Sequence, residues 1–451
     1  MSSIVKEPAS WPALSEDRNL RFSVIFLLYV AQGLPIGLFQ FAIPAWMAAR
    51  GSSAADVGYV LSAGLLPWSL KLVNGFIMDR YTFLAMGRRR AWLIGAQMVM
   101  ITGLLACAAL SPNVDDIWLL GAIGFAVNAA TTFQDVAVDG LAVDVMEEDE
   151  RGRASGMMFG GQAIGIALST AATGAAIGTY GPSAAFLVAA LFIFFVTLFV
   201  VATRERPGER LLPWSNGSAT EANRAIQADR WWPILRNTLV SILRPISLFY
   251  LPILLARGVQ FGLLIGMTPL IAAGSAGWSE GQITALTGTG QMVGGIVGLT
   301  IGGYLSDRFG TRRMGVALFS CWLALNTTAF LGQPLWADGR FLTVFVIAWM
   351  TADVCLTVAT LPIAMRLCNR TVAATQFTIY MALSNFGITL GAMLLAQAER
   401  LGGLANLFVV LGIFDIVAIA ILLMVRFPLR RVDEAGTDPF REGSMAAPAV
   451  T

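Results

Sequence analysis

The sequence predicts an all-α membrane protein that crosses the bilayer about twelve times, in two pseudo-symmetric halves of about six helices each. The first observation is composition. Of 451 residues, 56% are hydrophobic and only 13% are charged, with a mean hydropathy of +0.70, whereas soluble domains carry about 25% charged residues. The second is that apolar stretches of about 20 residues recur about twelve times. The third is a sequence pattern in the first half that returns in the second.

Composition also argues against several classes of function. The net charge of +2 gives no indication of nucleic-acid binding. The chain has no histidine, so a proton relay has to use carboxylates, and we expect neither an enzyme nor a metal site or cofactor. Without a Walker-type phosphate loop, ATP-driven transport is not expected. The cysteines fall in apolar stretches without metal-ligand spacing and are interpreted as buried packing residues: Cys107, Cys321, Cys355 and Cys368.

The predicted spans are each long enough to cross about 30 Å of hydrocarbon. We expect the first to break at Gly33 and Pro35 and to expose backbone groups to a cavity. The fourth contains a stripe of polar residues. The fifth and eighth carry glycines at four-residue spacing, which permit close helix packing. In chain order, the expected spans are 22–48, 57–78, 91–110, 117–143, 155–178, 183–203, 244–274, 281–305, 314–333, 341–366, 373–397 and 404–425.

Arginines are concentrated in alternate loops, which predicts the orientation of the chain. The short loops on the arginine-poor side carry only Arg50, Arg340 and Arg400. By the positive-inside rule, both termini are expected in the cytoplasm. The predicted organisation is a cytoplasmic segment, a six-helix half, a cytoplasmic linker, a second six-helix half and a cytoplasmic tail, at 1–21, 22–203, 204–243, 244–425 and 426–451 respectively.

An internal repeat supports the division into two halves. The segment Gln32–Gly37 aligns with Arg257–Gly262, and Asp135 in the fourth span has a near counterpart in Asp353 of the tenth. Parallel repeats of this kind, with a site where the halves meet, are typical of secondary transporters.

Two loops combine a glycine, an acidic residue and a run of arginines. The glycine permits close helix contact, the aspartate pairs with a cation or a helix end, and the arginines anchor the turn at the anionic leaflet. We interpret these residues as gating elements, with a purely topological role as the alternative. The loop between the eighth and ninth spans contains Gly303, Asp307, Arg308, Arg312 and Arg313. A longer version between the second and third spans contains Gly75, Asp79, Arg80, Arg88, Arg89 and Arg90.

This pattern resembles the signature loop of the major facilitator superfamily. The segments Val30–Gly37, Leu66–Lys71, Gly87–Trp92 and Phe133–Asp139 further resemble one branch of it, the AmpG muropeptide permease and acetyl-CoA transporter group, which also includes siderophore permeases. The resemblance is specific over residues 22–165 and general beyond them. It implies a permease that translocates bulky, polar or anionic conjugates, commonly coupled to protons.

The polar stripe of the fourth span is the candidate site of proton coupling. Asn128, Thr132, Asp135 and Asp139 fall on one helical face. A carboxylate at membrane depth costs roughly 2.5 to 3.5 kcal/mol and normally faces a bundle interior or a wet cavity. Lys71, at a similar depth in the second span, is predicted to pair with Asp139, while Asp135 binds and releases a proton. The alternative is a permanent structural ion pair.

Arg257 and Asp353 lie in spans that, in the superfamily that the sequence resembles, line the central cavity, and Gln32 is the repeat-equivalent of Arg257. The guanidinium could hold a carboxylate or phosphate through two parallel hydrogen bonds, or it could neutralise Asp353. Further candidate substrate ligands are Asn128, Gln134 and Gln291. Hydrogen bonds between helices explain Asn128, Gln291 and Asn385 equally well.

These features predict an inner-membrane secondary transporter that uses the proton gradient to take up a bulky polar or anionic organic solute. Candidate solutes are a muropeptide, a siderophore or a CoA-like conjugate, and the expected partners are the solute, protons and lipid. The protein is expected to act as a monomer. One alternative is a proton-antiport exporter of amphiphilic compounds. Another is a non-transporting assembly factor or sensor, against which the intramembrane charges argue.

Overall fold

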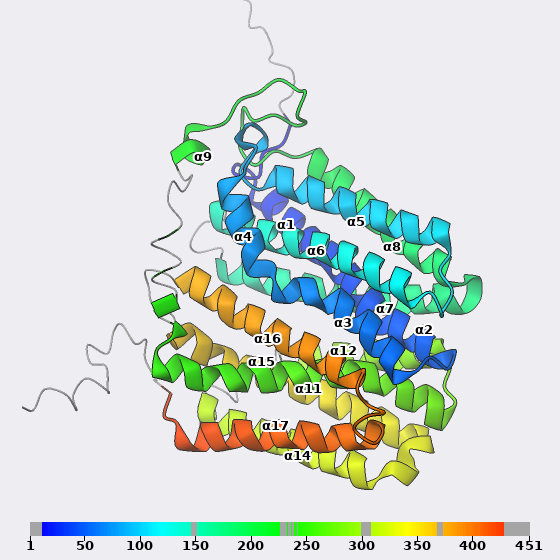
Figure 1. Ribbon diagram of the computed structural model, residues 1–451. Coiled ribbons are helices and arrows are strands. Elements are labelled where there is room, and N and C mark those ends of the chain that lie inside the picture. Colours follow the sequence, from blue (N-terminus) through cyan, green and yellow to red (C-terminus); the bar gives the residue numbers. More distant parts are fainter. Residues whose placement is uncertain are drawn as a thin grey trace, which may run out of the picture. The chain divides into compact units, whose positions relative to one another are not determined.

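The computed structural model describes residues 11–145, 151–225, 232, 236, 239–240, 242–298, 308–367 and 373–427. Within these ranges the chain is mainly helical (Figure 1), and ten helices are long and apolar enough to cross a membrane. Ten of the predicted spans correspond to these helices. The second and eighth predicted spans are not among the ten: the second is divided into two shorter helices, and the eighth is described only as an 18-residue helix, Glu280–Val297.

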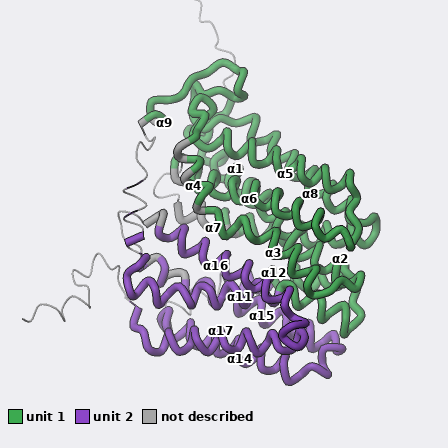
Figure 2. Tube along the Cα trace, viewed as in Figure 1, with its two compact units in different colours: residues 1–229, 265–292 green, residues 230–264, 293–451 purple. Residues whose placement is uncertain are grey.

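The chain forms two compact units, which Figure 2 shows in different colours. Unit 1 comprises residues 1–229 and 265–292, and unit 2 comprises 230–264 and 293–451. The helices up to residue 225 are α1 (Arg18–Gly37), η1 (Leu38–Ala42), α2 (Ile43–Ala49), α3 (Ala54–Ser69), α4 (Lys71–Arg80), η2 (Leu84–Met86), α5 (Arg90–Leu110), α6 (Ile117–Val145), α7 (Arg151–Tyr180), α8 (Pro182–Val201) and α9 (Glu221–Ala225).

Two helices, α11 (Pro245–Ala276) and α12 (Glu280–Val297), contribute to both units. The remaining helices belong to unit 2. They are α14 (Thr311–Leu331), η5 (Gln333–Ala337), α15 (Gly339–Leu367), α16 (Ala373–Leu395) and α17 (Leu404–Met424).

The first predicted span is continuous where we expected a break. Helix α1 runs through Gly33 and Pro35, and a π-helical segment, η1, follows. This widened turn ends two residues before Pro44, which has no N–H to donate to the preceding turn. Gly33 instead permits close contact with α7, because a Cβ at this position would lie 2.5 Å from the Gln162 carbonyl oxygen.

The second predicted span is divided into α3 and α4. Helix α3 contains Pro67, and Leu70 between the two helices has φ −96° and ψ 0°, outside the helical region. The two pieces have 16 and 10 residues, so each is shorter than the roughly 20 residues that a straight span needs. As a consequence, Lys71 is the first residue of α4 and stands directly after the break.

The core of unit 1 is apolar and lies between α1, α4, α5, α6 and α8, where Val24, Leu28, Met78, Leu93 and Val138 are fully buried. By contrast, α8 exposes large apolar side chains on its outer face, among them Leu191, Phe195 and Leu198. Exposing such a face to water is unfavourable, whereas contact with the hydrocarbon of a bilayer is favourable.

Candidate functional site

The polar stripe of α6 meets α1 and α4 in unit 1. Lys71 Nζ lies 3.1 Å from Asp135 Oδ2, and Gln32 Nε2 donates a hydrogen bond to Asp135 Oδ1 at 2.7 Å. The prediction that Lys71 pairs with Asp139 is therefore wrong, because its partner is Asp135. That prediction compared depths along a straight second helix, whereas Lys71 begins α4 after the break at Leu70.

Asp139 has a different partner. Its Oδ1 accepts a hydrogen bond from the Tyr29 hydroxyl, which reaches it from α1. Tyr29 and Gln32 are three residues apart on α1, and their acceptors, Asp139 and Asp135, are four residues apart on α6. The two hydrogen bonds between these helices therefore lie one helical turn apart. Sequence analysis missed Tyr29. Its position one helical turn before Gln32, in an apolar segment, is the signal that could have identified it.

The remaining polar residues of the stripe join neighbouring helices. Trp68 Nε1 donates to Asn128 Oδ1 at 3.1 Å, and Asn74 Nδ2 donates to Thr132 Oγ1 at 2.9 Å. Gln134, on another face of α6, donates through Nε2 to the Leu28 carbonyl oxygen at 2.7 Å. These contacts favour a helix-to-helix role for Asn128 and Gln134. Gln291 is half-buried on α12.

Unit 2 contains a second buried ion pair. Arg257 Nη2 on α11 lies 3.2 Å from Asp353 Oδ2 on α15, and Arg257 Nη1 donates to Ser384 Oγ on α16 at 3.4 Å. Of the two interpretations of Arg257, neutralisation of Asp353 is the one that this geometry favours. The pair also corresponds to the Gln32 to Asp135 hydrogen bond, because the sequence repeat aligns Arg257 with Gln32 and places Asp353 near Asp135.

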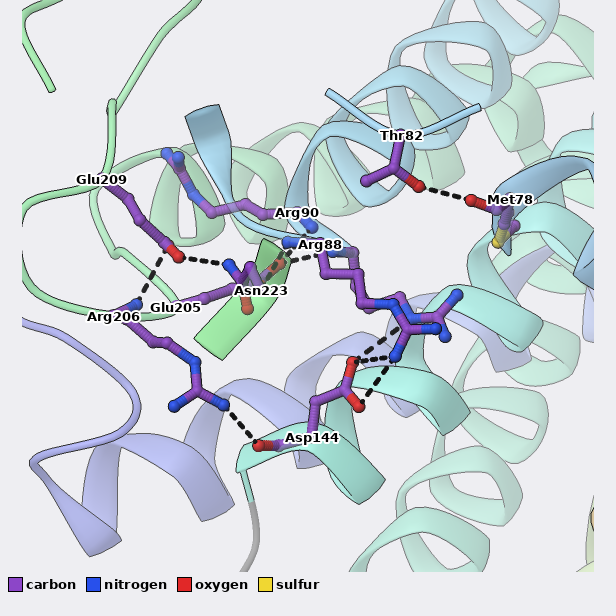
Figure 3. A network of polar contacts seen from close by, with 10 residues as sticks. Met78, Thr82, Arg88, Arg90, Asp144, Glu205, Arg206, Glu209 and Asn223 are labelled. Atoms are coloured by element: carbon purple, nitrogen blue, oxygen red, sulfur yellow. Dashed lines mark hydrogen bonds and ion pairs between the residues drawn. The ribbon is translucent and has the colours of Figure 1, made fainter. Parts of the chain in front are cut away.

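The arginines before α5 belong to a polar network at the N-terminal end of that helix (Figure 3). The backbone N–H groups of Arg88, Arg89 and Arg90 all donate to the Glu205 carboxylate, at 2.8, 2.6 and 2.5 Å. These groups have no partner within α5, so an anion at this position stabilises the helix end. The guanidinium groups of Arg88 and Arg89 lie 3.4 and 3.5 Å from Asp144, near the end of α6. Sequence analysis did not identify Glu205.

Arg90 and Arg312 perform equivalent tasks in the two units. Arg90 Nε and Nη2 donate to the carbonyl oxygens of Val200 and Val201 at the end of α8. Arg312 at the start of α14 donates to the carbonyl oxygens of Leu422 and Leu423 at the end of α17. Each arginine thus satisfies carbonyl groups that have no partner within their own helix.

The other residues of the two loops are placed as follows. Gly75 lies on α4, where an added Cβ would contact Val136 at 3.8 Å. The Arg308 guanidinium lies over the Phe309 ring, and Arg313 is exposed on α14. Gly303, Asp307 and the side chains of Asp79 and Arg80 lie outside the described part of the structure.

Glu209 is a second buried acid in the segment after α8. Its Oε1 accepts a hydrogen bond from Asn223 Nδ2 at 2.6 Å, and its Oε2 accepts one from the Arg206 N–H at 3.0 Å. Burial, and secondarily the nearby Glu205 carboxylate, raises the pKa of Glu209 from its ordinary value of 4.5 to about 7. Burial likewise raises the pKa of Glu205, against the three backbone N–H donors, which lower it.

The raised pKa of Glu209 makes the stability of this segment dependent on pH. The folded segment holds the proton more tightly than the unfolded one, so its stability is greatest below about pH 4.5 and is lost as the pH rises through about 7. We expect Glu209→Gln to reduce this decline, while the contribution of Glu205, whose pKa burial also raises, remains. The measurement is amide hydrogen exchange over residues 206–225 at pH 5 and pH 8, corrected for intrinsic rates. An equal pH response in both proteins would refute the assignment.

Comparisons with known protein sequences identify one family and several related transport proteins. Residues 25–279 match the sequence model of the Major Facilitator Superfamily. The anhydromuropeptide permease of Escherichia coli is 26% identical over 391 residues, which cover 81% of this chain and 72% of that protein. The putative transporter AmpG 4 of Rickettsia conorii is 23% identical over 397 residues, covering 82% and 87%.

Solved structures show the same fold. A variant of the nucleoside transporter NupG superimposes with a TM-score of 0.68 at 13% identity, over 90% of this chain and all of that one. A POT family transporter in complex with a thioalcohol-conjugated peptide gives a TM-score of 0.65 at 10% identity, over 89% and 95%. At these identities, the two structures support the fold alone.

Proposed function

This chain belongs to the major facilitator superfamily, and on that premise we propose that it is a proton-coupled transporter that takes up a polar organic solute. It is an AmpG-like permease and a multi-pass protein of the inner membrane. The proposal adds proton coupling, the direction of transport and the class of solute. It also takes residues 22–203 and 244–425 as the two membrane halves, with both termini in the cytoplasm and the monomer as the working unit.

The observation that carries the proposal is the charge balance of the cluster formed by Tyr29, Gln32, Lys71, Asp135 and Asp139. Two ionised carboxylates and one ammonium group leave one negative charge, and one bound proton removes it. An uncompensated carboxylate at membrane depth costs roughly 2.5 to 3.5 kcal/mol, so the neutral cluster is favoured when water leaves the site.

Coupling follows from this balance. Asp135 is compensated by Lys71, whereas Asp139 is contacted by the neutral Tyr29 hydroxyl. We therefore propose that Asp139 binds and releases the coupled proton. Asp135 stays ionised beside it, paired with Lys71. Protonation from the outside permits the site to close over the solute, and release of the proton to the cytoplasm resets the cluster. This revises the sequence-based assignment, in which Asp135 carried the proton.

A muropeptide is the first solute to test, because the E. coli relative is named an anhydromuropeptide permease. The experiment uses the full-length protein in oriented proteoliposomes with an acidic exterior and labelled anhydromuropeptide, ferric siderophore or acyl-CoA. We expect one solute to accumulate above its equilibrium concentration, and a protonophore to abolish this accumulation. Equilibration without accumulation would refute proton coupling, and proton-driven efflux would identify an exporter.

A further inference from the structure

One buried carboxylate of unit 2 has no part in the proposed transport mechanism. Asp415 lies near the middle of α17 and is 1% exposed. Its Oδ2 accepts a hydrogen bond of 2.8 Å from Asn326 Nδ2 on α14, and Asn326 is also 1% exposed. Figure 1 shows that α14 and α17 lie side by side. None of the ion pairs found among the described residues contains Asp415, so an ionised Asp415 would have no cation beside it.

The surroundings of this pair are apolar. Leu411 and Ala418, which lie on the same face of α17 as Asp415, are fully buried, and so is Trp322, one helical turn before Asn326 on α14. An ionised carboxylate in such an environment needs a paired cation or several hydrogen-bond donors. In the described structure it has one donor, the Asn326 amide. The environment therefore favours the neutral carboxylic acid.

The amide of Asn326 supplies a second, independent indication. Its Oδ1 is buried and has no hydrogen-bond partner in the described structure. Burying an acceptor without a donor is unfavourable, and an ionised Asp415 offers only further acceptors. A protonated Asp415 has one O–H donor. Donation of this O–H to Asn326 Oδ1 completes a reciprocal pair, in which the acid and the amide each donate one hydrogen bond.

The internal repeat shows that a polar pair is not needed for packing at this place. The contacts of Arg90 and Arg312 relate α5 and α8 of unit 1 to α14 and α17 of unit 2 at one constant spacing in the sequence. The same spacing relates Asn326 to Leu104 on α5 and Asp415 to Ile193 on α8.

Leu104 and Ile193 are both fully buried, and α5 packs against α8 as α14 packs against α17. Unit 1 therefore fills the equivalent place with two apolar side chains. Packing alone does not explain why unit 2 has an acid and an amide there.

We propose that Asp415 binds a proton that takes no part in transport, and that the resulting carboxylic acid stabilises the contact between α14 and α17 through its pair with Asn326. A proton is the ligand that fits, because both side chains are almost completely covered and a bound proton needs no cavity. The inference does not depend on the proposed transport function, in which Asp139 of unit 1 binds the coupled proton.

The test is infrared spectroscopy of the full-length protein at pH 7, in a detergent without ester carbonyl groups. A neutral carboxylic acid absorbs at a higher frequency than an ionised carboxylate, so the spectrum distinguishes the two forms of Asp415. We expect Asp415→Asn to remove a carboxylic acid band. The control is Glu399→Gln, which replaces an exposed acid and should remove only carboxylate bands.

Thermal unfolding tests the contribution of the pair to stability. Asn326→Leu leaves the buried acid without its partner and should lower the melting temperature. The double variant Asn326→Leu with Asp415→Ile introduces the two residues of unit 1 and should restore the melting temperature. Asp415→Asn keeps a neutral group that both donates to Asn326 and accepts from it, so this variant should melt close to the wild type.

Two results would overturn the bound proton. One is loss of a carboxylate band, and not of a carboxylic acid band, in Asp415→Asn. The other is a melting temperature that sodium or potassium ions raise at constant pH in the wild type but not in Asp415→Asn, because the bound cation is then a metal ion. If Asn326→Leu melts like the wild type, the pair does not stabilise the contact between α14 and α17.

The outcome is separable from that of the proposed function. Asp415→Asn should accumulate solute like the wild type. Loss of accumulation in this variant, with an unchanged melting temperature, would show that the proton on Asp415 is exchanged during transport and would overturn the proposal. If the wild type itself does not accumulate solute, proton coupling is refuted, whereas the infrared result for Asp415 still stands.

Discussion

Replacing Lys71 with methionine is expected to abolish gradient-driven accumulation and to destabilise the protein strongly. Asp135 is 5% exposed and its Oδ2 is 3.1 Å from Lys71 Nζ. Removing one partner of a buried pair leaves an uncompensated charge, which costs about 3 to 5 kcal/mol. Thermal unfolding in detergent would show this loss, and accumulation in proteoliposomes would show the loss of transport.

Removing both Lys71 and Asp135 tests the charge balance of the cluster. In the double variant Lys71→Met with Asp135→Asn, neither charge remains, so the melting temperature should return most of the way to that of the wild type. Accumulation should also return, because Asp139 remains and its single negative charge still requires one proton. Asp135→Asn alone should abolish accumulation, because Lys71 is then left to balance the charge of Asp139, and should leave exchange of solute across the membrane possible. If the double variant regains stability but does not accumulate solute against its gradient, the assignment of the coupling proton to Asp139 is wrong.

Gly165→Ala is expected to separate α1 from α7 and to lower stability by about 1 to 3 kcal/mol. A Cβ at Gly165 would collide with the backbone of Val30, whose carbonyl carbon and Cα would lie 2.9 and 3.0 Å away. Backbone atoms cannot rotate aside as a side chain can, so the two helices themselves have to move. The measurement is the melting temperature of the full-length protein together with its yield from the membrane.

The matched control lies on the same helix. An added Cβ at Gly160 would meet no heavy atom within 4 Å, and alanine is a better helix former than glycine by roughly 0.8 to 1.0 kcal/mol. Gly160→Ala should therefore leave stability unchanged or raise it. If the two variants have equal melting temperatures, the close approach of α1 and α7 does not limit stability.

Apolar length and periodicity were enough to predict most of the helices and the polar face of α6, because both depend on local sequence. The pairing of Arg257 with Asp353 was one of two alternatives that the family resemblance and the internal repeat left open, and the distance of 3.2 Å favours it. Local sequence was insufficient to predict the interruption of the helix after Ser69. Because of this interruption, Lys71 pairs with Asp135 and not with the predicted Asp139. Local sequence also gave no indication of Glu205, because its partners Arg88 to Arg90 are more than 100 residues away.

The segment before α1 has consequences for the order of biosynthesis. Ala13 forms a parallel bridge with Arg204, in which the Leu14 N–H donates to the Arg204 carbonyl oxygen at 2.8 Å and the Arg204 N–H donates to that of Pro12 at 2.9 Å. About 190 residues separate the partners, so at about 5 to 20 residues per second the ribosome needs roughly 10 to 40 s to make the second after the first. Until Arg204 has been made, the backbone groups of Pro12 and Leu14 lack these hydrogen-bond partners. This pairing can form only after α8 has been made. The time at which a cross-link between positions 14 and 204 first forms during translation would therefore show when the segment from α1 to α8 has been completed.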